Sequence, residues 1–258
     1  MNQEEKRISL IKYLLDENPE YRNINIPSSD ENQKNLLRSL MNIRLPKEID
    51  KNILKIQDEY LRDAIKKKGI TDIKNLTEIK KDIYLWQGDI TTLKVDAIVN
   101  AANDQMTGCY YPCHKCIDNA IHTFAGMQLR LECAKMMKNK KREETGSAEI
   151  TNAYNLPAKY IIHTVGPIIY SKVTKKEEEQ LASCYNSCLE LAAKHNLNSI
   201  AFCCISTGEF SFPPSLAAKI AIQTVSSYKE KTNNKIKVIF NVFKESDYEI
   251  YNKLLRTN

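Results

Sequence analysis

The sequence predicts an α/β fold in which a mostly parallel sheet is covered by helices on both faces. From about Lys81 onward, short apolar runs alternate with longer amphipathic stretches, as is typical of strands connected by helices. Before that point, apolar residues recur at helical spacing. The chain has 258 residues, of which 42% are hydrophobic and 27% charged. This length allows one large domain, or a medium domain with an extension.

The first part of the chain, residues 1–80, is expected to be a helical N-terminal extension. Three stretches, which begin near Ile8, Leu36 and Ile53, carry apolar residues three or four positions apart, and Gly69 follows a lysine run as a helix stop. No constellation of catalytic groups is found there. We therefore expect a cap or docking element before a main domain over 81–258.

Five strands and four helices are predicted in residues 81–258. The helix that includes Glu177 is the best determined, because Thr174 and Glu177 form a capping box ahead of an apolar stripe. The predicted strands are Ile83–Trp86, Val95–Ala101, Tyr160–Val165, Ser199–Ile205 and Lys237–Phe243. The predicted helices are Ile117–Met137, Glu177–His195, Pro214–Lys229 and Asp247–Leu255.

Four of the seven glycines follow apolar runs, at points where a strand passes into a loop. Glycine lets backbone amides approach a ligand closely, and ligands of open α/β sheets bind beyond the carboxyl ends of the strands. One such glycine is equally well an ordinary turn residue, but the four together favour a binding crevice. They are Gly88, Gly108, Gly166 and Gly208.

The overall charge and hydrophobicity exclude some classes of function. A net charge of +6 fits a solvated, lysine-rich surface or attraction to an anionic ligand such as a nucleotide. No cluster of basic residues interleaved with aromatics marks a nucleic-acid groove, so nucleic acid is not an expected partner. No run reaches the length of a membrane span, and the first twenty residues lack the apolar core of a signal peptide. We expect a cytoplasmic protein that does not bind membranes.

A short loop after the second predicted strand concentrates thiols and an imidazole. Cys109, Cys113, His114 and Cys116 lie within eight residues of one another, and thiolate and imidazole are the ligands that zinc prefers. Cys109, His114 and Cys116 are the best candidate set, and three protein ligands leave one coordination position open, as in catalytic sites. Cys113 could replace or join them, which would close the site. The alternative is a set of reduced, partly buried thiols.

The other histidines and cysteines are expected to be structural. His163 lies inside a predicted strand and is read as a core histidine, and His122 lies one turn into a predicted helix. Four further thiols are expected in the core, two on an apolar helix stripe and two in a strand on opposite faces of the sheet, where cysteine packs as a small hydrophobic residue. They are Cys184, Cys188, Cys203 and Cys204.

Four linked segments resemble the successive signatures of macrodomains, in family order. They are Gln87–Thr91, Val95–Asn103, Leu156–Pro167 and Ile205–Phe210. The resemblance covers residues 81–258 and implies a three-layer α/β/α sandwich with a mixed, mostly parallel sheet. Where the ordinary macrodomain hydrolase has a glycine-rich run, this chain has the cysteines and histidine between Gly108 and Asp118. This departure is similar to the bacterial zinc-containing branch, which also carries a helical N-terminal extension.

The resemblance assigns roles around the nucleotide. It implies that Asp89 accepts a hydrogen bond from the adenine amino group and that the Ile90 backbone completes the contact with the base. Asn103 matches the asparagine that orients the distal ribose. Asp118 matches the aspartate that lies beside this ribose and assists hydrolysis.

It also assigns a phosphate loop and a metal site. The amides of the phosphate loop are expected to hold the diphosphate, while its Phe ring packs near the distal ribose. This loop consists of Ser206, Thr207, Gly208, Glu209 and Phe210. Cys109, His114 and Cys116 match the zinc positions of the branch.

The function implied by the resemblance is zinc-dependent hydrolysis of mono-ADP-ribose from an Asp or Glu side chain of a modified protein. Zn2+ would bind a ribose hydroxyl or a water, and Asp118 would act as base or position the nucleophile. The first alternative is an ADP-ribose-binding reader without catalysis. The second is a zinc-stabilised interaction module with four closed ligands. The resemblance further implies a sirtuin-type ADP-ribosyltransferase as functional partner, and a lipoyl-carrier protein like glycine cleavage protein H as a substrate.

Overall fold

The computed structural model describes residues 1–257 and is built around one seven-stranded mixed sheet. Its strands, in spatial order, are β2 (Glu78–Lys80), β3 (Ile83–Gln87), β9 (Lys237–Val242), β8 (Ser199–Phe202), β5 (Ala97–Ala102), β7 (Tyr160–Val165) and β6 (Ala148–Asn152). The five central strands run parallel, and the edge strands β2 and β6 pair antiparallel. The short strands β1 (Thr71–Asp72) and β4 (Leu93–Lys94) form a separate parallel pair. The predicted mixed, mostly parallel sheet is confirmed.

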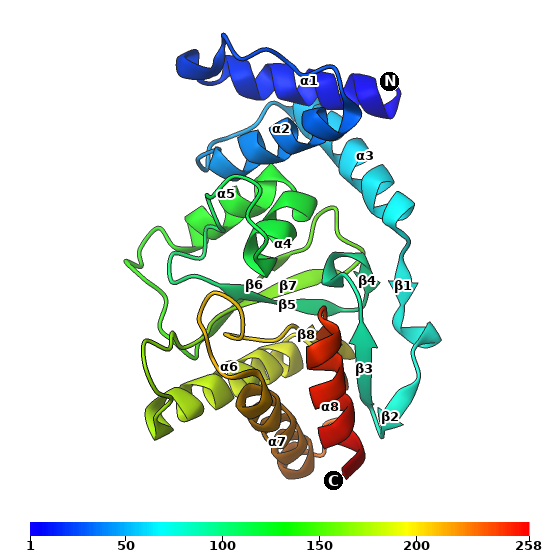
Figure 1. The fold of residues 1–258 in the computed structure, drawn as a ribbon, viewed down its shortest axis with the longest axis vertical. Helices are drawn as coiled ribbons and strands as arrows, with labels where there is room; N and C mark the ends of the chain where they lie inside the picture. The colour runs from blue at the N-terminus through cyan, green and yellow to red at the C-terminus, as the bar shows by residue number, and fades with distance from the viewer. Residues whose placement is uncertain (258) are drawn as a thin grey trace.

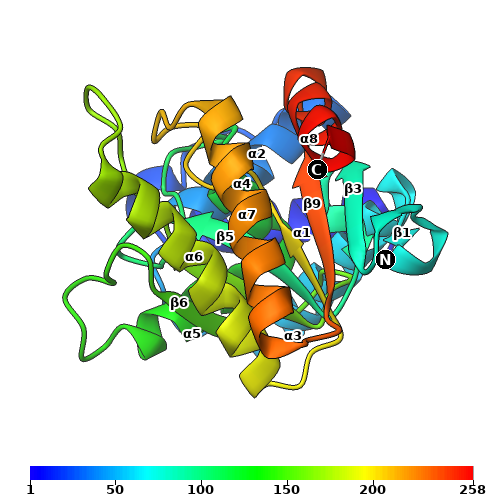
Figure 2. The same ribbon diagram turned by 90° about the horizontal axis from the view of Figure 1, so that it is seen from below.

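Helices cover both faces of this sheet (Figures 1 and 2). One face carries α6 (Lys175–Lys194), α7 (Pro214–Thr232) and α8 (Glu245–Thr257), and the other carries α4 (Ile117–Ala125) and α5 (Met127–Met136). The predicted capping box begins α6, where Glu177 accepts a hydrogen bond from the Thr174 backbone N–H at 2.8 Å. Within the described chain, no helix combines the length and apolar character needed to cross a membrane.

Three N-terminal helices form a further layer on top of α4 and α5 (Figure 1). They are α1 (Gln3–Asp16), α2 (Asp30–Ile43) and α3 (Lys51–Lys68), and α3 ends at Gly69 as expected. Their apolar faces pack into a cluster of their own, which Met127 of α5 joins from the body of the molecule. The helical character of the N-terminal region is therefore confirmed, and this region is packed onto the helices that follow the cysteine loop.

The single helix predicted over Ile117–Met137 is wrong, because the chain breaks there into α4 and α5. The break lies at Gly126, whose φ of +106° is in the left-handed region. A Cβ at this position would lie 2.7 Å from both the Gln57 amide nitrogen and the Gln128 amide oxygen. The apolar pattern continues across the break, so periodicity alone could not reveal it.

The predicted strand boundaries also need correction. Strand β8 ends at Phe202 rather than at Ile205, and β5 begins at Ala97 rather than at Val95. The edge strands β2 and β6 were not predicted, because half-exposed edge strands lack the continuous apolar run of the central strands. Cys203 and Cys204 therefore lie beyond β8, with Cys203 buried and Cys204 half-buried.

The parallel strands end at one edge of the sheet, and this places the site. The chain turns out of β3 at Gly88, out of β5 at Asn103 and out of β9 at Phe243. Residues 203–213 leave the same edge after β8. Because ligands of open α/β sheets bind beyond the carboxyl ends of the strands, these four exits define the candidate crevice.

Candidate active site

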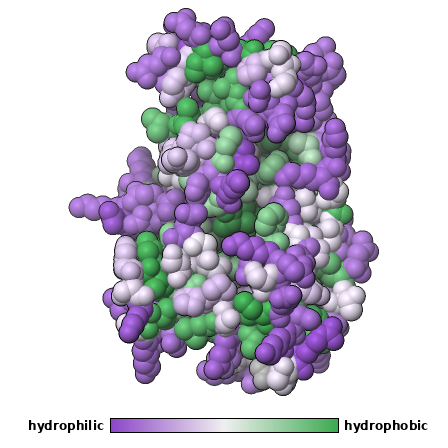
Figure 3. Space-filling model, viewed as in Figure 1, coloured by the Kyte–Doolittle hydropathy of each residue, from purple (hydrophilic) through white to green (hydrophobic). Residues whose placement is uncertain are grey.

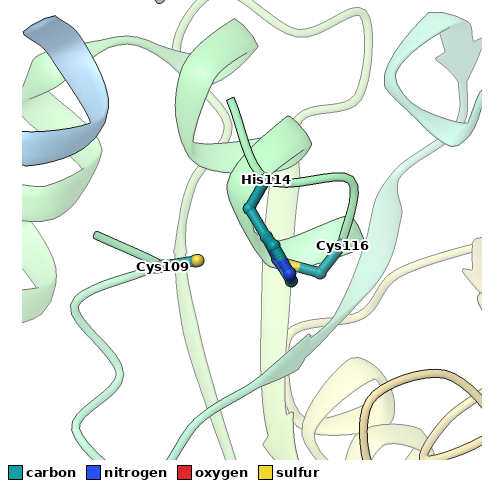
Figure 4. Close-up of side chains that lie close together, drawn as sticks. All are labelled: Cys109, His114 and Cys116. Carbon is teal, nitrogen blue, oxygen red and sulfur yellow. The ribbon is translucent and has the colours of Figure 1, made fainter. Parts of the chain in front are cut away.

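The three predicted zinc ligands converge in the loop between β5 and α4 (Figure 4). The thiols of Cys109 and Cys116 and a ring nitrogen of His114 all lie within 4.8 Å of one another. All three residues are half-buried, and Cys116 caps α4 by accepting a hydrogen bond from the Asn119 N–H at 3.4 Å. The Nδ1 atom of His114 is buried and has no hydrogen-bond partner within residues 1–257.

The electrostatics of this cluster fit a cation. Burial and the neighbouring Cys109 raise the pKa of the Cys116 thiol to about 12, so Cys116 would stay protonated at neutral pH by itself. A bound divalent cation reverses this, because a coordinating thiol is deprotonated outright. Two thiols and an imidazole with an unpartnered nitrogen therefore suit zinc.

Asp118 lies in the first turn of α4, directly behind the loop. Its carboxylate is only 4% exposed and accepts hydrogen bonds from the side-chain amides of Asn100 at 2.8 Å and Asn103 at 3.2 Å. Burial raises the pKa of Asp118 to about 6, although the hydrogen bond from Asn100 and the charge of Arg130 oppose the shift. Asn103 also donates to the Gly108 carbonyl at 3.2 Å. One asparagine thus orients both the loop and the carboxylate.

A second group of potential ligands lies in the core beneath Asp118. The side chains of His122, Cys133 and His163 are buried, with ligand atoms within 4.8 Å of one another. The His163 ring lies 2.9 Å from the Thr151 hydroxyl and 3.1 Å from the Asn100 amide nitrogen. These contacts satisfy both ring nitrogens, as expected of a core histidine.

The loop passes close over His122, and this explains one of the conspicuous glycines. Gly108 has a φ of +83°, and a Cβ there would lie 2.7 Å from the His122 ring. Any other residue would push the loop away from α4 and carry Cys109 with it.

Helix α2 contacts, from outside the main domain, the loop of the candidate metal ligands (residues 103–116, hereafter the metal loop). Arg38 donates to the His114 carbonyl at 2.9 Å, and the Asn42 side chain accepts from the Cys113 N–H at 2.9 Å. The Cys113 thiol lies 3.2 Å from the Ser39 hydroxyl, and its backbone is left-handed, with a φ of +53°. Cys113 therefore points toward α2 and lies outside the group of three ligand atoms. It anchors the loop to the N-terminal helices.

Arg130 of α5 fixes the start of the same loop. Its guanidinium is buried and donates hydrogen bonds of 2.5 to 3.2 Å to five backbone carbonyls. Two of these belong to the metal loop and three to the end of α2 and the residues after it. The acceptors are Thr107, Cys109, Met41, Asn42 and Arg44.

Asp89 lies at another exit of the sheet, just after β3. One carboxylate oxygen accepts from the N–H and hydroxyl of Thr91 at 3.0 and 2.6 Å, and the other from the Lys68 ammonium at 2.8 Å. Burial raises the pKa of Asp89, but the hydrogen bonds from Lys68 and Thr91 outweigh it and hold the pKa below its usual value. Lys68, the last residue of α3, also lies 3.4 Å above the Phe124 ring.

An exposed aromatic ring accompanies Asp89. Phe243 directly follows β9 and is 77% exposed, and the carbonyl of the preceding Val242 accepts from the Gly88 N–H at 3.0 Å. An exposed ring beside an ionised acceptor and the buried Ile90 can stack on a planar base. No role of Phe243 was predicted from the sequence.

The predicted phosphate loop turns sharply back on itself. Ser206 is buried with a left-handed φ of +64°, and its carbonyl accepts from the Phe212 N–H at 2.9 Å. In the part of the chain that is described, the amides of Gly208, Glu209 and Phe210 donate no hydrogen bond. Successive free amides in a turn attract anions.

The phosphate loop also reaches the metal loop. A carboxylate oxygen of Glu209 lies 3.7 Å from the His114 Nε2 atom. Thr207 is held in place by its hydroxyl, which donates to the Cys204 carbonyl at 3.0 Å. The two loops predicted from separate motifs are therefore neighbours.

Comparisons with known proteins agree with this arrangement. A model of the Macro domain family matches residues 99–221. A relative from Treponema medium is 56% identical over 260 residues, which span 99% of this chain and 100% of the relative. The chain belongs to the macrodomain family. A relative from Staphylococcus aureus (strain MSSA476) is 50% identical over 248 residues, 93% of each chain. Both relatives bear the name protein-ADP-ribose hydrolase.

Solved structures support the same fold. The Trypanosoma brucei macrodomain in complex with ADP-ribose is 30% identical and superposes with a TM-score of 0.66, over 84% of this chain and 94% of that one. In the present chain, every site residue predicted from the sequence lies in a loop or a first helical turn at the carboxyl edge of the sheet. Some contributors were not predicted, namely Asn100, Phe243, Lys68, Arg38, Asn42 and Arg130.

Proposed function

We propose that this macrodomain hydrolyses the bond between ADP-ribose and an acidic side chain of a modified protein, with zinc held by Cys109, His114 and Cys116. The observation that carries the proposal is a group of three zinc donors in the loop that leads to a buried carboxylate, Asp118. The names of the bacterial relatives and the ADP-ribose bound to the trypanosome macrodomain support the ligand.

The nucleotide is held by groups that take no part in bond breaking. Asp89, kept ionised by Lys68, accepts from the adenine amino group, and Phe243 stacks on the ring. The free amides of Gly208, Glu209 and Phe210 hold the diphosphate. This binding supplies the energy that aligns the distal ribose with the reacting groups.

The reacting end is organised by the asparagines and the metal loop. Asn103 orients the ribose and donates to one oxygen of the Asp118 carboxylate, while Asn100 donates to the other. Asp118 accepts a proton from the nucleophile or positions it. When bound, zinc supplies a Lewis acid that polarises the reacting centre, and three protein ligands leave it one free coordination position. The carboxylate of an Asp or Glu side chain leaves as a stable anion, so one proton acceptor suffices for this linkage.

The test is Cys109→Ser, measured for metal content, release of ADP-ribose from an Asp- or Glu-linked protein, and binding of free ADP-ribose. We expect loss of zinc and of turnover, with ADP-ribose binding retained. Cys113→Ser is the matched control, because its thiol faces α2, and it should keep both metal and activity. Full activity of a metal-free Cys109→Ser enzyme would exclude the role of zinc. Binding without release by the zinc-loaded wild type would make the protein a reader.

A further inference from the structure

A cleft of about 440 Å3 lies between the N-terminal helices and α4. Residues of α1, α2, α3 and α4 line it, so it exists only because the N-terminal layer is packed onto the main domain. Figure 3 shows hydrophilic side chains bordering paler ones where these two parts of the molecule meet. Its volume falls within the range of about 300 to 1,000 Å3 that ligand sites occupy.

The lining of the cleft is basic. Five cationic residues line it, against one carboxylate, Asp30, but Arg7 is only 3% exposed and Lys68 is paired with Asp89 outside the lining. Arg7 binds Asp30 at 2.8 Å, and Lys34 pairs with the same group. Within residues 1–257, neither Arg38 nor Lys67 has a carboxylate at ion-pair distance. The cationic residues are Arg7, Lys34, Arg38, Lys67 and Lys68.

The floor of the cleft is apolar. It is formed by side chains of the N-terminal hydrophobic cluster together with the Phe124 ring of α4. A bare phosphate would leave this floor uncovered, whereas a peptide places carboxylates on the rim and an apolar side chain on the floor. The floor residues are Leu37, Met41, Tyr60 and Leu61.

We propose that this cleft binds an acidic segment of the protein that carries the ADP-ribose, with one large apolar side chain seated on its floor. That the partner is the substrate rests on the proposed function. The charge and shape of the cleft are independent of it. Two lining residues also belong to the active-site surroundings, because Arg38 binds the His114 carbonyl and Lys68 binds Asp89. A segment held here therefore lies alongside the nucleotide crevice, and its binding helps to present the modified side chain.

The first test measures binding without hydrolysis. The probe is a short fluorescent peptide of Glu and Asp around one central Leu, compared with its Gln and Asn counterpart. Lys34→Gln/Lys67→Gln should weaken binding of the acidic peptide about three- to tenfold, since each exposed ion pair contributes modestly. The matched control is Lys219→Gln/Lys231→Gln, on exposed positions of α7 across the sheet, which should bind like the wild type.

The second test uses an ADP-ribosylated acidic protein. We expect the KM of the cleft variant to rise by a similar factor, with kcat and the affinity for free ADP-ribose unchanged. Equal binding of the acidic peptide by wild type and cleft variant overturns the proposal, and so does equal binding of the acidic and the neutral peptide. Displacement of the acidic peptide by millimolar inorganic phosphate also counts against it. Charge-dependent binding without any hydrolysis would contradict the proposed function and leave the cleft proposal standing.

Discussion

Single side chains in this site serve two neighbours at once. The side-chain amide of Asn100 donates to Asp118 at 2.8 Å and lies 3.1 Å from the His163 ring, so it couples the candidate base to the core of the sheet. Asp89 is shared in the same way between Thr91 and Lys68. Each shared contact fixes a side chain before any ligand arrives, which lowers the ordering cost of binding.

Acidification should destabilise the fold through the buried histidines. Burial lowers the pKa of His163 to about 3, well below the value of about 6.5 in an unfolded chain. Between these values only the unfolded chain takes up the proton, so the free energy of unfolding falls as pH falls, by up to about 1.4 kcal/mol per pH unit. In urea unfolding, the free energy of unfolding should fall less between pH 7 and pH 5 for His163→Gln than for wild type. The exposed His195→Gln is the control, and equal slopes for all three proteins would contradict this account.

Asp89 should make the protein discriminate between bases by accepting a hydrogen bond from the amino group of adenine. The wild type is expected to bind ADP more tightly than inosine diphosphate, which lacks this group. Asp89→Ala should lose at least about tenfold in ADP affinity, because a hydrogen bond to a charged acceptor contributes about 1.5 to 3 kcal/mol. Calorimetry with both nucleotides measures the effect. If Asp89→Ala still prefers ADP, the base lies elsewhere.

Helix α2 connects the N-terminal helices to the metal loop. Three of its residues at helical spacing, Arg38, Ser39 and Asn42, meet the metal loop, while the opposite side of the helix packs against α1. The N-terminal region therefore supports the loop of the candidate metal ligands as well as covering the main domain. Mutation of residues that position metal ligands commonly lowers metal affinity 10- to 100-fold.

Asn42→Ala should weaken zinc binding by about tenfold. The variant loses the acceptor for the Cys113 N–H and the donor to the Thr123 hydroxyl, two hydrogen bonds of 2.9 Å each. Competition with a chelator measures the metal affinity, and ADP affinity should stay within twofold of the wild type. Asn32→Ala, at an exposed position of the same helix, is the control. Unchanged zinc affinity in Asn42→Ala would show that the loop holds its shape without α2.

The elements of the main domain could be predicted where apolar patterns are long and uninterrupted. Strand β7 and helix α6 were placed closely, since buried parallel strands and capped amphipathic helices leave strong signals. The break at Gly126 and the edge strand β6 were missed, because a glycine within a continuing stripe and a half-exposed strand do not change the pattern. The grouping of Cys109, His114 and Cys116 could be predicted because these residues lie close together in the chain.

The supports of the site could not be predicted. Lys68 meets Asp89 across 21 positions, and Arg130 meets Met41 across 89. Such pairs are created only when the N-terminal layer docks on α4 and α5, and neither partner is unusual in its own segment. Asn100 and Phe243 were within reach, since both lie at the carboxyl end of a predicted strand.

At the scale of the whole molecule, the two larger hydrophobic cores of the described residues are joined by Met127 and by polar contacts. One core surrounds the sheet and the other lies among α1, α2 and α3. Arg130 is central to the junction, because its guanidinium binds carbonyls from both parts.

Arg130→Met should lower the free energy of unfolding by about 3 kcal/mol or more, since it leaves buried carbonyls without donors. The metal loop should loosen at the same time, so zinc content should fall with stability. Urea denaturation and metal analysis measure both effects. Arg142→Met, on an exposed side chain paired with Asp104, is expected to change neither. A stable Arg130→Met protein with full zinc would mean that Arg130 does not hold the two parts together.

The contacts of Arg130 and Lys68 differ in a way that ionic strength should expose. Lys68 meets a partly exposed carboxylate, and an ion pair of this kind fades as dissolved salt screens it. Arg130 donates its hydrogen bonds only to carbonyl oxygens and stacks on the Tyr110 ring in a buried setting, with no carboxylate of residues 1–257 at ion-pair distance. High salt should therefore loosen the N-terminal layer near Asp89, while the metal loop keeps its position.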